Sequence, residues 1–116
     1  MILRMQVYHV YILTNYSRTV LYTGVTNNLD QRIIEHYLNR NDEKTFTGKY
    51  KTYYLLFYEA HQYILNAIAR EKEIKGWSRA KKLAMVQSFN PEMIFLNKEV
   101  LGKWPPDEVS HRKDLQ

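Results

Sequence analysis

The sequence predicts an α+β fold in which helices flank a small three-stranded sheet, antiparallel or mixed. Three observations predict it. Segments rich in β-branched and aromatic residues are followed by segments with helical periodicity, in the order β-β-α-β-α-α. Only six turn-forming residues (TNYSRT) separate the first two strand-like segments, which favours an antiparallel hairpin. The chain has 116 residues, a length typical of one domain.

The three strands are expected where β-branched and aromatic residues gather. Residues 7–13 read VYHVYIL, residues 20–25 read VLYTGV, and residues 52–58 read TYYLLFY. The last segment is apolar enough for a central strand. Because side chains alternate along a strand, Tyr22 and Gly24 are expected on the same face.

Periodicity and capping residues predict three helices. The first covers residues 28–39 and begins at an asparagine that can cap it. The second covers residues 62–75 and stops at a glycine, and the third covers residues 78–88 and begins at a capping serine. Between the first helix and the third strand, residues 39–48 (NRNDEKTFTG) are expected to form a polar, mobile loop.

The predicted elements form one domain over residues 1–97. A tail over residues 98–116 holds Pro105 and Pro106 and ends in mixed charges, so it is expected to be loosely ordered. The sequence shows no internal repeat and no second domain.

The composition excludes several kinds of chemistry and favours nucleic acid as a partner. The chain has no cysteine, which excludes disulfides, zinc–thiolate sites and cysteine nucleophiles. No apolar run reaches the length of a membrane span, and a cytoplasmic protein is expected. A formal net charge of +5, with ten tyrosines and two tryptophans, favours a partner that offers phosphates and bases.

The first predicted helix carries Arg32 and His36 four residues apart, which puts both side chains on one face. They border the apolar stripe of that helix, so they are expected to look toward the edge of the sheet. An arginine fork suits a phosphate, and a histidine can move a proton near neutral pH. The alternative is a solvated surface pair in which His36 bonds to Glu35 or to the backbone.

A carboxylate interrupts the apolar stripe of the second predicted helix. Four apolar residues recur there at helical spacing, and Glu71 falls among them. A carboxylate rarely occupies such a position unless it is paired or binds a metal. Two interpretations are open: a salt bridge, for example with Lys75, or a ligand for one Mg²⁺ ion that keeps most of its waters.

The strand residues Tyr11 and Tyr22 have an ordinary interpretation as aromatics of a sheet. A phenol has a reference pKa of about 10, so it is a poor base unless its phenolate is stabilised. Gly24 is more informative, since a glycine inside a strand indicates a close backbone approach or a bulge.

Basic residues gather around the second and third predicted helices. They predict a track for a nucleic-acid backbone, with ordinary solvated helix faces as the alternative. The residues expected to bind nucleic acid are Lys49, Arg70, Lys72, Lys75, Arg79, Lys81 and Lys82.

Taken together, these segments resemble the GIY-YIG nuclease family. The matching text is VYHVYIL, LYTGVTNNLDQRIIEH, FTGKY, AIAREKEIKGWSRAKK and FNPE, in this order over residues 7–92. The chain is similar to the small single-domain bacterial members of the family. It departs from the family pattern at His9 and Val10 in the first motif and at Thr23 in the second.

The resemblance implies roles for three residues of the strands. Tyr11 matches the tyrosine proposed to activate water. Tyr22 matches the second-motif tyrosine, which supports the nucleophile or the phosphate. Gly24 matches the glycine that keeps the backbone compact beside the site.

The resemblance also implies roles for residues outside the strands. Arg32 matches the arginine that stabilises phosphate charge, and His36 matches the position that accepts or relays a proton. Glu71 matches the sole metal-binding carboxylate. Asn90 matches a late asparagine that hydrogen-bonds within the site.

The activity that the resemblance implies is hydrolysis of DNA phosphodiester bonds with one Mg²⁺ or Mn²⁺ ion held by Glu71. The expected partner is DNA, branched and single-stranded forms included, and the expected setting is DNA repair or recombination. A protein partner that directs the enzyme to its target is also expected.

Two other classes of function stay open. A nucleic-acid-binding module on the same fold would bind DNA in a salt-sensitive way without metal-dependent cutting. A protein-interaction domain would use exposed aromatic residues around a neutral cleft.

Overall fold

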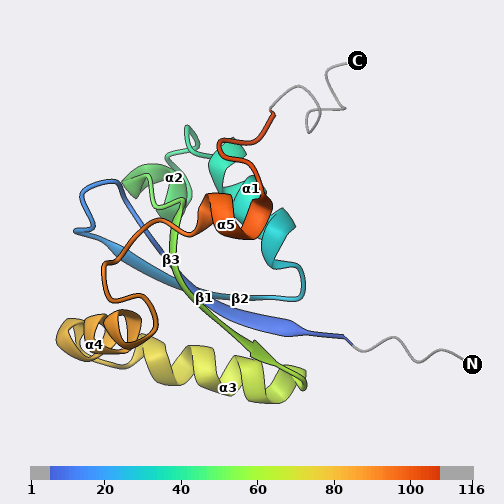
Figure 1. Cartoon of the computed structure of the whole chain (residues 1–116), viewed down its shortest axis with the longest axis vertical. Helices are drawn as coiled ribbons and strands as arrows, with labels where there is room; N and C mark the ends of the chain where they lie inside the picture. Colours follow the sequence, from blue (N-terminus) through green and yellow to red (C-terminus); the bar gives the residue numbers. More distant parts are fainter. Residues whose placement is uncertain (1–5, 108–116) are drawn as a thin grey trace, which may run out of the picture.

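The sheet of the computed structural model, which describes residues 6–107, has three strands in the order β2-β1-β3. The strands are β1 (Tyr8–Thr14), β2 (Leu21–Thr26) and β3 (Tyr54–His61). Both neighbours of β1 run antiparallel to it. The predicted α+β class and the three-stranded sheet are therefore confirmed, and the sheet is antiparallel throughout (Figure 1).

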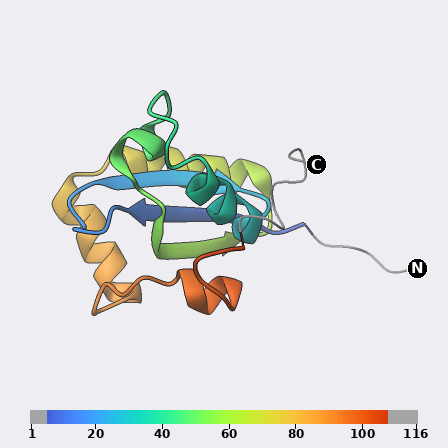
Figure 2. The same ribbon diagram turned by 90° about the horizontal axis from the view of Figure 1, so that it is seen from above.

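Helices cover both faces of this sheet. On one face lie α1 (Leu29–Leu38), α2 (Phe46–Tyr50) and α5 (Asn97–Leu101), and on the other lie α3 (Ile64–Lys75) and α4 (Arg79–Phe89) (Figure 1). The view from above shows α2 toward the β2 side of the sheet and α5 toward the β3 side (Figure 2). Among residues 6–107 no helix is long and apolar enough to span a membrane.

Each face of the sheet has its own apolar core, because side chains alternate along the strands. The core under α3 and α4 contains Val10, Ile12, Leu56, Phe57, Ala67, Ile74 and Val86. The core under α1 and α5 contains Tyr11, Leu13, Leu29, Ile33, Leu55 and Leu96. Tyr11 therefore belongs to the α1 side of the sheet.

The strand register places a bulge in β3. Ile12 pairs with Phe57, but the next residue of β1 pairs with Leu55, so Leu56 is an extra residue. The bulge lets Leu56 and Phe57 both join the core under α3 and α4. On the other side of β1, Tyr11 pairs directly with Gly24 of β2.

The helix starts follow the predicted caps. The Asn28 side chain accepts a hydrogen bond from the Gln31 amide at 3.1 Å at the start of α1. The Ser78 side chain accepts one from the Lys81 amide at 3.2 Å at the start of α4. The second predicted helix ends at Gly76, as expected.

Two buried asparagines close the outer edge of β3. Asn97 accepts a hydrogen bond from the Leu55 amide at 2.7 Å and donates one to the Tyr53 carbonyl at 2.8 Å. Asn90 donates to the Leu56 carbonyl at 3.1 Å. Backbone groups beside the bulge are thus satisfied by side chains of the following segment rather than by a fourth strand.

The structure differs from the sequence-based expectation in three segments. The predicted mobile loop over residues 39–48 contains the start of α2, and the third strand begins and ends later than predicted. The predicted loose tail forms α5 and a packed turn, in which Trp104 contacts the core and Pro106 is buried. The rest of the predicted tail, residues 108–116, lies outside the described residues.

Candidate active site

The ring of Tyr11 crosses the neighbouring strand at Gly24. Tyr11 is fully buried, and a Cβ added to Gly24 would lie 2.5 Å from both the Cζ and the hydroxyl oxygen of Tyr11. Any side chain at this position of β2 would therefore displace the phenol. Gly24 is required because the tyrosine ring occupies the space of its missing side chain, which agrees with the close approach predicted for this glycine.

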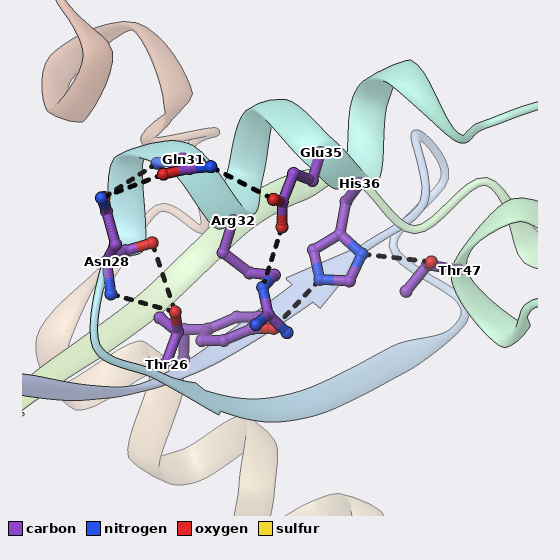
Figure 3. Close-up of polar contacts among 8 residues, drawn as sticks. Thr26, Asn28, Gln31, Arg32, Glu35, His36 and Thr47 are labelled. Atoms are coloured by element: carbon purple, nitrogen blue, oxygen red, sulfur yellow. Dashed lines mark hydrogen bonds and ion pairs between the residues drawn. The ribbon is translucent and has the colours of Figure 1, made fainter.

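The Tyr11 hydroxyl reaches a histidine on α1. Its oxygen lies 3.0 Å from Nε2 of His36, and Nδ1 of the same ring lies 3.2 Å from Oγ1 of Thr47 on α2. Figure 3 shows the imidazole of His36 between its two partners, with Thr47 on one side. The sequence-predicted residues Tyr11 and His36 are thus joined by a hydrogen bond, and Thr47 fixes the orientation of the ring.

The site holds both groups in their neutral forms. Burial, with a smaller contribution from the Arg32 charge, lowers the pKa of His36 to about 4. Burial also raises the pKa of the Tyr11 phenol, and the neighbouring Tyr22 adds to this, while Arg32 acts in the opposite direction. A neutral imidazole has one donor and one acceptor nitrogen, so it can take a proton from the phenol at one nitrogen and donate at the other.

Arg32 is held beside this pair at the mouth of a cavity. Its side chain is 42% exposed, and its Nε lies 3.2 Å from a carboxylate oxygen of Glu35 (Figure 3). A cavity of about 280 Å³ opens next to it. The lining residues are Tyr22, Arg32, Glu35, His36, Asn39, Thr45, Phe46 and Thr47. The exposed pair with Glu35 is weak, so an anion in the cavity can compete for the guanidinium.

Tyr22 connects the buried and the open parts of the site. Its ring centroid lies 6.3 Å from that of Tyr11 and 5.5 Å from that of His36. It is half-buried and lines the cavity, whereas Tyr11 is fully enclosed. Of the two predicted tyrosines, Tyr22 is the one that faces the cavity.

Glu71 acts on Tyr11 from the opposite layer of the fold. It lies on α3, which packs against β1 and β2, and its side chain is 14% exposed. Its charge contributes to the raised pKa of Tyr11, which places the carboxylate near that phenol. It also forms an ion pair with Lys75 at 3.1 Å, so the salt bridge considered from the sequence is present.

Asn90 is the predicted site residue that the structure places elsewhere. Its amide donates to the carbonyls of Leu56 and Ile94, and its side-chain oxygen accepts from the Ile94 amide. These bonds commit the side chain to the backbone at the outer edge of β3. Asn90 is therefore a structural residue here, and we leave it out of the proposed site.

The predicted nucleic-acid-binding residues are divided between the two faces of the sheet. Lys49 lies on α2, on the face that carries α1, and the other six lie on α3 and α4. Three of the six have polar partners: Arg70 donates to Glu59 at 2.7 Å, Lys75 pairs with Glu71 at 3.1 Å, and Arg79 donates to the Arg18 carbonyl at 3.1 Å. The exposed lysines of α3 and α4 remain the candidates for contacts with a phosphate backbone.

Sequence reasoning assigned no role to two residues of the site, Thr47 and Phe46. Thr47 is buried and hydrogen-bonds to His36, and Phe46 forms part of the cavity wall. Both lie in the segment FTGKY, which already stood out by its resemblance to the family text. The resemblance therefore pointed to the segment, but not to the role of Thr47. That role depends on a hydrogen bond to His36, eleven residues away.

Comparisons with known proteins relate the chain to one protein family. The family model of the GIY-YIG catalytic domain matches residues 7–84, a range that contains every predicted site residue except Asn90. A UPF0213 protein of Syntrophus aciditrophicus (strain SB) is 35% identical over 86 residues, 74% of this chain and 95% of that protein. A UPF0213 protein of Staphylococcus aureus (strain Mu3) is 31% identical over 67 residues, 58% of this chain and 79% of that protein. No solved structure matches the chain.

Proposed function

The chain belongs to the GIY-YIG family, whose domain is that of a nuclease superfamily, and from this premise we propose that it is a metal-dependent DNA endonuclease. It hydrolyses phosphodiester bonds with one divalent ion. The setting that we propose is DNA repair or recombination in the cytoplasm. DNA is the proposed substrate because the chain is basic and carries an arginine at an open cavity.

One observation carries this proposal: the hydroxyl of Tyr11 has a hydrogen-bond partner on α1 and lies within the electrostatic influence of charged side chains from both layers of the fold. His36 hydrogen-bonds to it, and the charges of Arg32 and Glu71 both act on its pKa. A binding surface does not need a proton-accepting imidazole, a cation and a carboxylate around one buried phenol. Hydrolysis of a phosphate ester has a use for all three kinds of group: proton transfer, stabilisation of the phosphate charge and binding of a metal ion.

The carboxylate of Glu71 fits one Mg²⁺ or Mn²⁺ ion. Among residues 6–107 there is no cluster of three or more histidine or acidic side chains that could enclose a metal. A single carboxylate, Glu71, is the pattern expected for an ion that keeps several waters and also binds the substrate phosphate. When bound at Glu71, such an ion supplies charge neutralisation at the phosphate and lowers the pKa of the attacking water.

The protein's own groups then handle the phosphate and the proton. Arg32, half exposed at the cavity, binds the phosphate, and the substrate must displace part of the cavity wall for the attacking water to reach the enclosed hydroxyl of Tyr11. Tyr11 cannot store a phenolate, because its pKa is raised. It passes its proton to Nε2 of His36 while its oxygen takes a proton from the attacking water, and Nδ1–H donates to Thr47 meanwhile. With a pKa of about 4, protonated His36 readily returns that proton to the leaving oxygen or to solvent.

Cleavage of supercoiled plasmid with Mg²⁺ or Mn²⁺ tests the proposal. Tyr11→Phe removes the relay hydroxyl and should slow cleavage by about 10²-fold or more. Arg32→Ala should reduce the cleavage rate by about 10²–10³-fold. Glu71→Gln should abolish metal-dependent cleavage. Tyr16→Phe is the matched control, since it removes the same hydroxyl from a ring that is 74% exposed and outside the cavity. Equal rates for all five proteins would contradict the proposal.

The charged groups of the site are already paired with each other or with neighbours. This pairing favours a second candidate function, a DNA-binding module without efficient catalysis. Glu71 is paired with Lys75, and Arg32 is paired with Glu35. A module of this kind would bind DNA in a salt-sensitive way and would leave the plasmid intact with either metal.

A further inference from the structure

The short helix α2 presents an aromatic surface beside the proposed active site. Phe46 is 46% exposed and Tyr50 is 40% exposed, and their ring centroids lie 4.7 Å apart. The Phe46 ring also lies 5.7 Å from the ring of Tyr22, with 32° between the two planes. The rings of Tyr22, Phe46 and Tyr50 thus form a continuous row from the cavity to the surface, which we call the aromatic shelf.

The backbone that carries the shelf is fixed on both sides of Phe46. The Thr45 side chain caps α2 by accepting a hydrogen bond from the Gly48 amide at 3.0 Å. Gly48 is packed so closely on Asp42 that any side chain at this position would collide with the Asp42 carbonyl. On the other side, buried Thr47 is bonded to His36. The backbone that carries the exposed ring of Phe46 is therefore held in place before any ligand arrives, and preorganisation of this kind favours binding.

The shelf begins at the group proposed to bind the phosphate. Phe46 and Arg32 line the same cavity, and Tyr22, the innermost ring of the shelf, lies next to the buried phenol of Tyr11. The nucleotide attached to a phosphate on Arg32 would therefore meet the aromatic shelf first. Lys49 adds positive charge, with Nζ 5.3 Å from the Tyr50 ring centroid. The acidic residue in the cavity wall, Glu35, is already paired with Arg32.

We propose that the aromatic shelf stacks an unpaired nucleobase next to the phosphate held by Arg32. The substrate is then single-stranded nucleic acid, or the single-stranded part of a branched one. In an uninterrupted duplex the neighbouring bases cover both faces of each base, so no face is free for Phe46. Stacking on an aromatic ring accepts any base and therefore gives a preference for unpaired structure rather than for sequence. This inference rests on the proposed function for the role of Arg32.

Binding measured without cleavage tests the shelf. The probes are a fluorescein-labelled DNA single strand of about 12 nucleotides and the duplex of the same sequence, each followed by fluorescence anisotropy in a chelator. Phe46→Ala should bind the single strand about tenfold more weakly, which corresponds to the loss of one stacked base. Its affinity for the duplex should be that of the wild type. The same strand made as RNA shows which sugar the site prefers, since a tenfold loss with either supports the shelf.

Phe89→Ala is the matched control. Phe89 has the same exposed fraction as Phe46, 46%, but it lies at the end of α4, on the other face of the sheet. It should bind both probes as the wild type does. If Phe46→Ala lowers the melting temperature, Phe46→Leu replaces it, because leucine keeps the apolar bulk and lacks the ring. Phe46→Leu should show the same tenfold loss.

Three results would overturn the shelf: an unchanged affinity of both Phe46 variants for the single strand, an equal loss for the duplex, or an equal loss in Phe89→Ala. The shelf and the nuclease can fail separately. A protein that binds single strands through Phe46 but cuts no DNA with metal contradicts only the proposed function. A protein that cuts duplex and single strand equally well, with or without Phe46, contradicts only the shelf.

Discussion

At the scale of single residues, Tyr11 and Gly24 share one space on neighbouring strands. The ring of Tyr11 occupies the position where a side chain of residue 24 would begin. Gly24→Ala should therefore push the phenol away from His36. We expect the free energy of unfolding to fall by about 1–3 kcal/mol, and cleavage to fall with it. Urea unfolding and the plasmid assay measure the two effects.

Gly76→Ala is the control for that substitution. A Cβ at this position would lie 3.5 Å from its nearest neighbour, the Glu73 carbonyl oxygen, and the φ of −81° suits alanine. It should leave the stability unchanged or raise it by about 0.4–1 kcal/mol. If both alanine variants had the stability of the wild type, the close approach of Tyr11 to Gly24 would be wrong.

His36 predicts a specific loss of stability in acid. Its pKa is about 4 in the folded protein, against 6.5 for an unperturbed histidine, because it is buried beside Arg32. Between these two values the unfolded chain takes up a proton that the folded protein does not, so stability falls as pH falls from 6.5 to 4. His36→Gln should lack this part of the pH dependence.

Urea midpoints of the wild type and of His36→Gln at several pH values check this. The pKa of His9 is also lowered by burial, but that contribution is common to both proteins and cancels in the difference. The same pH dependence in both proteins would show that His36 is not buried in its neutral form.

The residues of the candidate site were predictable to the extent that the sequence contained a local anomaly. Glu71 interrupts an apolar stripe, and Arg32 and His36 lie one helical turn apart, so each stood out without knowledge of the fold. The sequence gives no such signal for Asn90, because an amide beside a proline looks the same whether it bonds to a substrate or to a backbone carbonyl. Its partners are the backbone of Ile94 and the Leu56 carbonyl of a strand 34 residues away.

At the scale of elements, α5 protects the bulged strand β3. Asn97 satisfies the Leu55 amide and the Tyr53 carbonyl. Asn97→Ala would leave both backbone groups without these partners, and we expect a loss of about 2–4 kcal/mol in the free energy of unfolding. Chemical denaturation measures it.

Asn66→Ala is the matched control, since Asn66 is exposed on α3. It should change the stability by no more than about 0.5 kcal/mol. Similar losses in the two variants would mean that the contact between α5 and β3 contributes little.

Under the proposed function, a lysine of α3 competes with the metal ion for Glu71. Lys75 is 52% exposed and pairs with Glu71, the proposed metal ligand. Lys75→Met should free the carboxylate and tighten binding of Mn²⁺ by about twofold to fivefold, the amount expected for an exposed ion pair. Titration calorimetry of Mn²⁺ without DNA measures the affinity.

Lys72→Met removes the same charge from the same helix, and Lys72 is exposed. It should leave the Mn²⁺ affinity near that of the wild type. An equal gain in both variants would indicate a general effect of charge, and no gain in either would argue against a metal at Glu71.

Elements that depend on neighbouring residues were predicted well, and elements that depend on distant contacts were missed. The caps Asn28 and Ser78 act within their own first turns, so the sequence contains what is needed to place α1 and α4. By contrast, α2 is anchored where Thr47 meets His36. Likewise, α5 begins at an asparagine bonded to β3. The polar composition of residues 39–48 predicted a loop where α2 begins. Pro105 and Pro106, which follow α5, predicted a loose tail in its place.

At the scale of the whole molecule, the positive charge is spread over both layers. If the α3–α4 side carries the phosphate track, Lys72→Ala with Lys81→Ala should reduce the slope of log affinity for single-stranded DNA against log salt by about 1.4. The pair Lys98→Ala and Lys103→Ala, on exposed residues near α5, removes the same charge and should leave the slope unchanged. Anisotropy over a salt series distinguishes the two pairs, and equal slopes would place no track on α3 and α4.

The division of the site between two layers has a consequence for the order in which the protein is made. A ribosome releases Tyr11, Tyr22, Arg32 and His36 well before the segment that carries Glu71. Under the proposed function, a nascent or interrupted chain that ends before α3 holds the phosphate-binding and proton-handling groups but lacks the carboxylate. Cutting therefore begins only when α3 has emerged and packed against β1 and β2. The fold itself would keep unfinished copies of a nuclease harmless to the cell that makes them.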